Sequence, residues 1–289
     1  MRVAIATDTN SGITAEEGRR LGVYVISMPV LIDGNTCYEG EDLTEADLYR
    51  YMREGRRVAT SQPSPGDILE LWDRVLETYD ALVYVPMSSG LSASCQTAQA
   101  LAADYDGRVQ VADTHRISVP QRLAVLDGLA MAEAGCTAEE IRLELERTGM
   151  DAMIYIGVET LQYLRRGGRV TAAAAAMSDL LQIKPLLKIE GEKLDAFAKV
   201  RGVKACKQRL IEAMRQTIAG FRGKGWTISV CAAGSFSTPE EESAWFFQVR
   251  EAFPEEEIRC APLALSIGCH TGPGAFGMAA VRHADIPGK

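Results

Sequence analysis

Residues 81–92 read ALVYVPMSSGLS, an apolar run that ends in small hydroxyl residues. The β-branched run up to Pro86 is typical of a buried strand, and residues 92–105 favour a helix because they are rich in Ala, Gln and Leu. A strand-to-helix turn of this kind brings backbone N–H groups, the positive end of a helix and several hydroxyl donors to one point. The stretch therefore predicts an anion-binding turn or, as the common alternative, a serine that only caps the helix.

Strands and helices alternate around this stretch through about residue 150. Such alternation indicates a parallel sheet with helices on its faces, so we expect an N-terminal α/β domain over residues 1–150. The predicted strands cover residues 3–7, 23–27, 81–85 and 109–112, and the predicted helices cover residues 15–21, 67–79, 92–105, 120–134 and 138–147.

The pattern changes after residue 150, where a hairpin is mixed with helices. Residues 191–193, which read GEK, are typical of a turn between two strands. We therefore expect a C-terminal α+β domain over residues 151–289. Its predicted strands cover residues 153–158, 186–189, 194–200, 227–232 and 258–267, and its predicted helices cover residues 204–219 and 239–252.

The composition is that of an ordinary soluble protein, with 47% hydrophobic and 24% charged residues in a chain of 289. A chain of this length can bury the cores of two domains. Its net charge of −8 argues against nucleic acid as a partner, because phosphate binding needs a basic face. The first residues run into a strand without a signal-peptide pattern, and no apolar run is long enough to span a bilayer, so we expect a cytoplasmic protein.

Cysteine and histidine usage predicts neither disulfides nor a metal site. The seven cysteines include no C-x-x-C pair, and we expect them to be reduced, buried fillers. His115, His270 and His283 lack the spacing of metal ligands, so we expect no metal and no cofactor. The cysteines are Cys37, Cys95, Cys136, Cys206, Cys231, Cys260 and Cys269.

Four turns of the predicted α/β domain are rich in hydroxyl residues. Ligands of parallel sheets bind at the carboxyl ends of the strands, so these turns can meet at one edge of the sheet. Thr60, Ser61 and Ser92 would offer neutral donors there that suit a carboxylate. In any single turn, hydroxyl residues are more simply explained as turn formers. The four turns are residues 7–11, 60–64, 88–92 and 113–118.

Two further segments offer charged or titratable groups. Arg165, Arg166 and Arg169 flank a pair of glycines and form the densest basic spot in the chain, and a guanidinium fork matches a carboxylate or a phosphate. The simpler interpretation of these arginines is solvated surface charge. His270 lies among glycines that let the backbone approach a ligand, although a single histidine is more often structural.

Sharper enzyme patterns fail on spacing. Residues 272–277 match G-x-G-x-x-G, but only 12 residues follow, which leaves no room for the next strand and its ribose-binding acid. Ser92 lacks the second glycine of a nucleophile elbow and has no recognisable acid–histidine pair. Cys269 and His270 could act as nucleophile and base, but neighbours in a strand point to opposite faces. A serine or cysteine acyl-ester hydrolase therefore stays as an alternative function.

Six segments, taken in order, resemble the DegV family of bacterial fatty-acid-binding proteins. The resemblance spans nearly the whole chain and implies two α/β domains with one long-chain fatty acid buried between them. Some members of that family act as the acyl-carrying subunit of fatty acid kinase, in which a separate kinase subunit phosphorylates the carboxylate. The segments are TDT at 7–9, TSQPS at 60–64, SSGLS at 88–92, LRRGGRV at 164–170, KPLL at 184–187 and GCHTGPG at 268–274.

Carried over residue by residue, the resemblance implies that Thr60, Ser61 and Ser92 hold the carboxylate. His270 would complete the hydrogen-bond network, and Arg169 would support His270. The chain departs from the family pattern just after Ser92, which affects the pocket wall rather than the head-group site.

The expected function is therefore that of a non-catalytic carrier that presents its fatty acid to a partner kinase. A lipid-sensing regulatory module is a further alternative. A kinase has to cover the mouth of the pocket, and local positive charge there would orient the encounter. Arg165, Arg166 and Arg201 are the candidates for these partner contacts, Arg201 because it ends a hairpin strand. Their alternative role is ordinary surface solvation.

Overall fold

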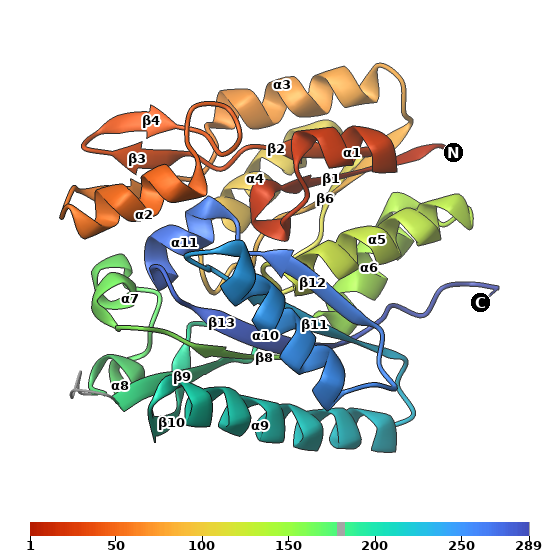
Figure 1. The fold of residues 1–289 in the computed structure, drawn as a ribbon. Helices are drawn as coiled ribbons and strands as arrows, with labels where there is room; N and C mark the ends of the chain where they lie inside the picture. The colour runs from red at the N-terminus through yellow and green to blue at the C-terminus, as the bar shows by residue number, and fades with distance from the viewer. Residues whose placement is uncertain (178–182, 289) are drawn as a thin grey trace.

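The computed structural model describes residues 1–177 and 183–288, which form three sheets with helices around them (Figure 1). The first is the expected parallel sheet, with the strand order β2-β1-β6-β7. Its central strands β1 and β6 are buried along their full length, so residues 81–85 form a central strand as predicted. The strands are β1 (Val3–Asp8), β2 (Val23–Ile26), β6 (Ala81–Val85) and β7 (Val109–Val111).

Helices cover both faces of the parallel sheet. On one face, Trp72 of α3 lies edge-on to Tyr84 of β6, with ring centroids 5.8 Å apart. The other face packs on α5 and α6 through Ala124, Ile141 and Leu145. The helices are α1 (Ala15–Leu21), α3 (Pro65–Leu76), α4 (Ser94–Ala102), α5 (Val119–Glu133) and α6 (Ala138–Gly149), with short 3₁₀ turns η1 (Thr9–Ser11) and η2 (Ala103–Tyr105).

A small antiparallel sheet with the order β4-β3-β5, which the sequence analysis does not predict, is inserted between β2 and β6. Its hairpin turns at Asp33 and Gly34, which have positive φ of 52° and 90°. Asp-Gly is a strong hairpin signal, but strands of three residues give no periodicity to support it. This sheet positions Thr60, which ends β5. The elements are β3 (Val30–Ile32), β4 (Asn35–Cys37), β5 (Val58–Thr60) and helix α2 (Glu45–Arg53).

The third sheet has six strands in the order β10-β9-β8-β13-β11-β12. It mixes parallel and antiparallel pairs, as expected for an α+β arrangement. The predicted hairpin is confirmed as β9 and β10, which pair antiparallel. The strands are β8 (Ala152–Gly157), β9 (Ile183–Ile189), β10 (Asp195–Arg201), β11 (Ile228–Gly234), β12 (Ile258–Pro262) and β13 (Phe276–Arg282).

The prediction of a strand over residues 258–267 is wrong in its second half, because β12 ends at Pro262 and a helix begins at Leu265. An apolar run of this length fits either type of element. A tertiary contact favours the helix, since the Glu39 carboxylate accepts a hydrogen bond from the N–H of Leu265 at 2.9 Å. The last strand, β13, is also absent from the prediction. The helices of this half are α7 (Gln162–Gly167), α8 (Ala172–Ala175), α9 (Val203–Gly223), α10 (Pro239–Ala252) and α11 (Leu265–Thr271).

The six-stranded sheet has two different faces, because side chains alternate along each strand. On one face, Tyr155, Val230 and Met278 belong to the apolar core formed with α9 and α10. On the other face, Ala279 packs with Leu123 of α5. Helix α5 therefore lies between the parallel sheet and the six-stranded sheet (Figure 1).

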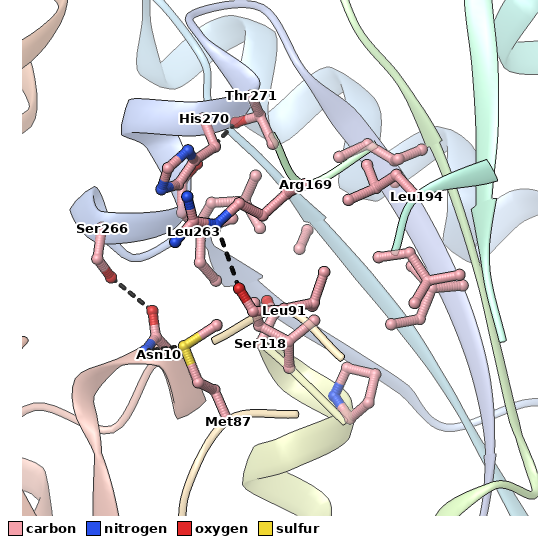
Figure 2. A pocket seen from close by; sticks show the side chains of 18 of the residues that line it. Asn10, Met87, Leu91, Ser118, Arg169, Leu194, Leu263, Ser266, His270 and Thr271 are labelled. Carbon is pink, nitrogen blue, oxygen red and sulfur yellow. Dashed lines mark hydrogen bonds between the residues drawn. The ribbon is translucent and has the colours of Figure 1, made fainter. Parts of the chain in front are cut away.

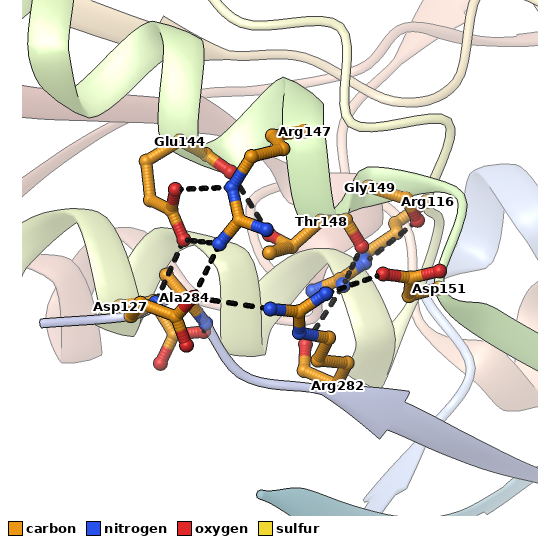
Figure 3. Close-up of polar contacts among 10 residues, drawn as sticks. Arg116, Asp127, Glu144, Arg147, Thr148, Gly149, Asp151, Arg282 and Ala284 are labelled. Carbon is orange, nitrogen blue, oxygen red and sulfur yellow. Dashed lines mark hydrogen bonds and ion pairs between the residues drawn. The ribbon is translucent and has the colours of Figure 1, made fainter. Parts of the chain in front are cut away.

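A buried arginine joins the two halves of the chain (Figure 3). Arg116 is only 1% exposed, and its guanidinium donates to the carbonyls of Thr148 at 2.7 Å, Arg282 at 2.9 Å and Gly149 at 3.2 Å. Burial lowers the pKa of Arg116 to about 10, so the group keeps its charge at neutral pH. Arg282 in turn pairs with Asp151 at 2.9 Å. These contacts surround the predicted domain boundary at residue 150, which itself stays a prediction.

The β9–β10 hairpin rests on the turn that follows β6. The Ser88 hydroxyl donates to the carbonyl of Gly191 at 2.7 Å, and a Cβ added at Gly90 would lie 2.7 Å from the Cα of Glu192. A side chain at position 90 would therefore push the hairpin away. Ser88 holds the hairpin and does not cap α4, whose N-terminus has no side-chain cap and lies at Ser94, later than predicted.

The remaining expectations from composition concern cysteines, metals and membranes. All seven cysteines are free thiols, but only Cys95, Cys206, Cys231 and Cys269 are buried, and the other three are half-buried. Within residues 1–177 and 183–288, no group of three or more His, Cys, Asp or Glu side chains could hold a metal ion. No helix in the same ranges has the length and apolar character needed to cross a membrane.

Candidate functional site

An apolar cavity lies between the parallel sheet and the six-stranded sheet (Figure 2). The space that the centre of a water molecule can occupy inside it has a volume of about 130 Å³. Each of the four hydroxyl-rich turns contributes to its lining, so the predicted meeting of these turns is confirmed. The contributing residues are Asn10 from the first turn, Thr60 and Ser61 from the second, Ser92 from the third and Ser118 from the fourth.

The wall on the side of the six-stranded sheet is apolar. Its residues come from four strands, and on β8 and β11 they occupy alternate positions, as expected where one face of a sheet meets the cavity. A wall of this kind suits an unbranched hydrocarbon chain, because the chain makes no demand for hydrogen bonds along its length. The wall consists of Ile154 and Ile156 of β8, Ile189 of β9, Cys231 and Ala233 of β11, and Gly277, Met278 and Ala279 of β13.

Neutral hydrogen-bonding groups gather where β5 meets α11. The Thr60 hydroxyl and the Nε2 atom of His270 lie 2.9 Å apart and share a hydrogen bond. Ser61 and Ser92 line the same cavity, and the Ser92 hydroxyl accepts a hydrogen bond from the N–H of Ser94 at 3.2 Å. The structure thus brings all four residues of the predicted head-group site to one cavity.

Arg169 adds a positive charge beside these groups (Figure 2). Its Nε donates to the carbonyl of Leu91 at 3.2 Å, and its Nη1 donates to the carbonyl of Gly167. Among the described residues it has no carboxylate partner, although it is half-buried. Arg165 differs, because it donates to the carbonyls of Ala175 and Met177 and so ties α7 to the end of α8.

His270 is held in its neutral form. Burial, and next the nearby charge of Arg169, lower the pKa of His270 to about 4. The imidazole therefore offers one donor and one acceptor at neutral pH and carries no charge. The fixed charge of the site belongs to Arg169.

Lowering the pH from about 6.5 to about 4 is expected to destabilise the fold through His270, by about 3 kcal/mol in total. The unfolded chain takes up this proton near pH 6.5, whereas the folded chain takes it up only near pH 4, so the loss grows as the pH falls through that window. A His270→Gln variant has no imidazole to protonate. Its stability relative to the wild type should therefore increase as the pH falls from about 6.5 to about 4. Urea unfolding of both proteins at a series of pH values measures the difference, which also cancels other titrating groups. A difference that does not change with pH would contradict the prediction.

A buried polar network that the sequence analysis does not single out shapes the neighbouring wall. The Asp8 carboxylate accepts hydrogen bonds from the N–H groups of Asn10 at 3.0 Å and Met87 at 2.9 Å. Burial raises the pKa of Asp8 in spite of these bonds. Asn10 in turn accepts a hydrogen bond from the Ser266 hydroxyl at 2.6 Å, which links the first turn to α11 (Figure 2). The only sign of this network in the sequence is the hydroxyl-rich turn at residues 7–11.

Cys269 is a poor nucleophile. Burial raises the pKa of its thiol to about 12, so the thiolate is negligible at neutral pH. Cys269 and His270 are neighbours on helix α11 rather than on a strand, and adjacent helical side chains also point in different directions. The pattern at residues 272–277 follows a helix and leads into β13, which is the reverse of the strand-to-helix order of a dinucleotide site.

A serine, a histidine and an aspartate form a hydrogen-bonded triad away from the cavity. His283 lies 2.7 Å from the Ser229 hydroxyl through Nε2 and 2.7 Å from the Asp127 carboxylate through Nδ1. None of the three residues lines the apolar cavity. Ser229 is only 7% exposed, and its neighbour Val230 is paired with strands on both sides, so no free backbone N–H follows the serine to form an oxyanion hole. These contacts tie α5 to β11 and to the end of β13.

Fold and cavity together define the class of this protein: an α/β protein that encloses an apolar cavity with one polar end between two sheets. Residues 2–283 match the family described as "Uncharacterised protein, DegV family". The chain therefore belongs to the DegV family.

Individual relatives cover nearly the whole chain. A DegV domain-containing protein of Deinococcus radiodurans is 31% identical over 280 residues, which are 96% of this chain and 98% of that protein. A solved structure from Thermus thermophilus, described as fatty acid binding of a DegV family protein, has a TM-score of 0.87 at 31% identity and covers 98% of this chain and 100% of its own. DegV of Bacillus subtilis, described as a fatty acid binding protein, has a TM-score of 0.84 at 25% identity and covers 98% and 99%.

Proposed function

We propose that this protein binds one long-chain fatty acid in the apolar cavity. The observation that carries the proposal is the polar end of the cavity, where the neutral pair Thr60 and His270 lies beside the half-buried charge of Arg169. In this arrangement Thr60, Ser61, Ser92 and His270 hydrogen-bond the carboxylate, and Arg169 supplies the opposite charge. The related proteins of Thermus thermophilus and Bacillus subtilis, both described as fatty acid binding, support the same ligand class.

The energetics assign different roles to tail and head. Burial of about 15 methylene groups at about 0.8 kcal/mol each gives roughly 12 kcal/mol before the costs of ordering. A hydrogen bond to the charged carboxylate contributes about 1.5–3 kcal/mol. The tail therefore supplies most of the affinity and the polar groups supply orientation. Such a site requires neither a metal nor a cofactor.

Mass spectrometry of ligand extracted from the purified protein tests the proposal. We expect a free fatty acid in about equimolar amount, because a tail buried between two sheets leaves slowly. Recovery of no lipid, together with no binding of added fatty acids, would overturn the proposal.

Replacing Ser92 with alanine is expected to weaken fatty-acid binding by about 1.5–3 kcal/mol, since one donor to a charged acceptor is lost. The fold should remain intact. Isothermal titration with a long-chain fatty acid measures the affinity. Ser89→Ala is the matched control, because Ser89 lies in the same turn but does not line the cavity. Equal affinities of the two variants would count against the assignment of Ser92.

We also propose that the protein presents its carboxylate to a partner kinase, which converts it into an acyl phosphate. Arg166 and Arg201 are both exposed and remain the candidates for partner contacts, whereas Arg165 is engaged with the end of α8. Complementary charge acts mainly on the rate and register of such an encounter.

Reversing Arg201 to Glu should leave fatty-acid binding unchanged and lower the yield of acyl phosphate in the presence of a kinase. The yield of the wild type should also fall with rising salt, because screening weakens the encounter. Arg20→Glu on α1 is the control, since it makes the same change of charge on an exposed helix that does not line the cavity. Loss of the lipid from the Arg201 variant would assign Arg201 to the pocket instead.

Two other functions compete with this proposal. An acyl-ester hydrolase would show ester turnover that disappears in Ser92→Ala, but the Nε2 of His270 is bonded to Thr60, and Cys269 is protonated. A lipid-sensing module would bind the fatty acid without forming acyl phosphate with any kinase. Ester turnover and acyl-phosphate assays on one preparation separate the three functions.

A further inference from the structure

A second cavity lies directly outside the head-group site. By the same measure as for the apolar cavity, its volume is about 150 Å³. Thr60, Arg169 and His270 line both this cavity and the apolar one, so these three side chains form the partition between them. A group attached to a carboxylate at Thr60 and His270 therefore has space on the outer side. We call this second space the arginine cavity.

The lining of the arginine cavity is positively charged. Arg56, Arg166 and Arg169 line it, and its described lining contains no aspartate or glutamate. This is unusual in a chain with a net charge of −8, in which acidic residues outnumber basic ones. The arginine cavity is thus a positively charged region next to the polar end of the apolar cavity.

The three arginines differ in the ion pairs and hydrogen bonds that their guanidinium groups already make. Arg56 pairs with Asp33 at 2.6 Å and stacks on the ring of Tyr51 at 4.1 Å. Within the part of the chain that the structure describes, Arg169 donates to two backbone carbonyls and to no side chain. Arg166 makes no hydrogen bond or ion pair with any residue in the described part of the chain. Two guanidinium groups therefore lack a carboxylate partner within residues 1–177 and 183–288, and His270 beside them is neutral.

We propose that the arginine cavity is the subsite for the phosphoryl group of an acyl phosphate whose chain fills the apolar cavity. The inference rests on the proposed function, because it needs the carboxylate at Thr60 and His270. Among the described residues, neither Arg166 nor Arg169 has a carboxylate partner, so the two guanidinium groups match the total charge of about two on an acyl phosphate, and their planar forks match its oxygens.

The chemistry fits the change of charge. A carboxylate oxygen attacks the terminal phosphorus of a nucleoside triphosphate held by the partner kinase, a new O–P bond forms, and the bond to the leaving diphosphate breaks. No proton is needed, and the lipid head group goes from one negative charge to about two. One cation balances the charge of the carboxylate. The acyl phosphate carries about one further negative charge, which a second arginine can balance.

Binding of a stable analogue tests the subsite. The probe is a long-chain β-ketophosphonate, in which a methylene group replaces the bridging oxygen of the acyl phosphate, and the reference ligand is the fatty acid with the same acyl chain. In Arg166→Gln we expect the affinity for the ketophosphonate to fall by about 10-fold and the affinity for the fatty acid to change by less than about 2-fold. Arg53→Gln is the control, because it removes one charge from the exposed end of neighbouring helix α2 without touching the cavity.

The outcomes separate this inference from the proposed function. If the wild type binds neither ligand, the proposed function fails. If it binds the fatty acid normally but Arg166→Gln and Arg53→Gln bind the ketophosphonate equally well, only the subsite is wrong. Inorganic phosphate titrated into the fatty-acid-loaded protein forms a further arm: tight binding of free phosphate with the acyl chain in place would assign the cavity to phosphate itself and overturn the acyl-phosphate assignment.

Discussion

Replacing Gly167 with alanine is expected to lower the affinity for a long-chain fatty acid by about 10-fold or more. Gly167 is the last residue of α7, and a Cβ added there would overlap the Nδ1 atom of His270 and lie 3.0 Å from its Cε1. The ring has to move, and the hydrogen bond between its Nε2 and Thr60 is lost with it. The carbonyl of Gly167 also accepts a hydrogen bond from Arg169, so both groups at the polar end are disturbed.

Isothermal titration measures this effect, and thermal unfolding shows that the variant is folded. Gly220→Ala is the matched control, because Gly220 is also helical, in α9, and an added Cβ there meets no atom within 4 Å. The control should bind like the wild type and be slightly more stable, since alanine favours a helix over glycine by about 1 kcal/mol. Unchanged affinity in Gly167→Ala would show that His270 does not position the ligand.

Replacing Arg116 with methionine is expected to lower the free energy of unfolding by about 3 kcal/mol. Methionine has a similar length and fills the space, but the carbonyls of Thr148, Gly149 and Arg282 lose their buried donor. Each buried acceptor left without a partner costs about 1–3 kcal/mol, and the recovered cost of burying the charge offsets part of the total.

Urea unfolding at neutral pH gives the value for this variant. Arg142→Met is the control, because Arg142 pairs with Glu146 at 2.7 Å near the surface, and such a pair contributes about 0.5 kcal/mol. Equal losses in the two variants would mean that the contacts of Arg116 add nothing beyond a surface ion pair.

The parallel sheet and its helices could be predicted from the sequence because local patterns determine them. Residues 81–85 are apolar throughout, and Thr137 with Glu140 forms a capping box at the start of α6. The strand β13 gives no such signal, since its sequence FGMAAVR is rich in small residues. Pairing with β8 on one side and β11 on the other makes it a strand.

The head-group site could be predicted only in part from the residues themselves. The hydroxyl-rich turns indicate an edge where a ligand could bind, but nothing local shows that Thr60 meets His270. Only the resemblance to a family assigns these two residues to one network. The link between Asn10 and Ser266 was missed for the same reason, because a contact between distant segments leaves no periodic pattern in the chain.

The hydrogen bond between Thr60 and His270 joins residues 210 positions apart. Neither half of the chain can therefore assemble the head-group site alone, and the site is complete only after the last helix has docked. A ligand that binds such a site binds the native chain and not the unfolded one. By mass action, a fatty acid at about 100 times its dissociation constant adds about 2.7 kcal/mol to the stability of the whole molecule. Lipid supply and the lifetime of the folded protein are thereby coupled, so that the loaded form outlasts the empty form wherever unfolded chains are degraded.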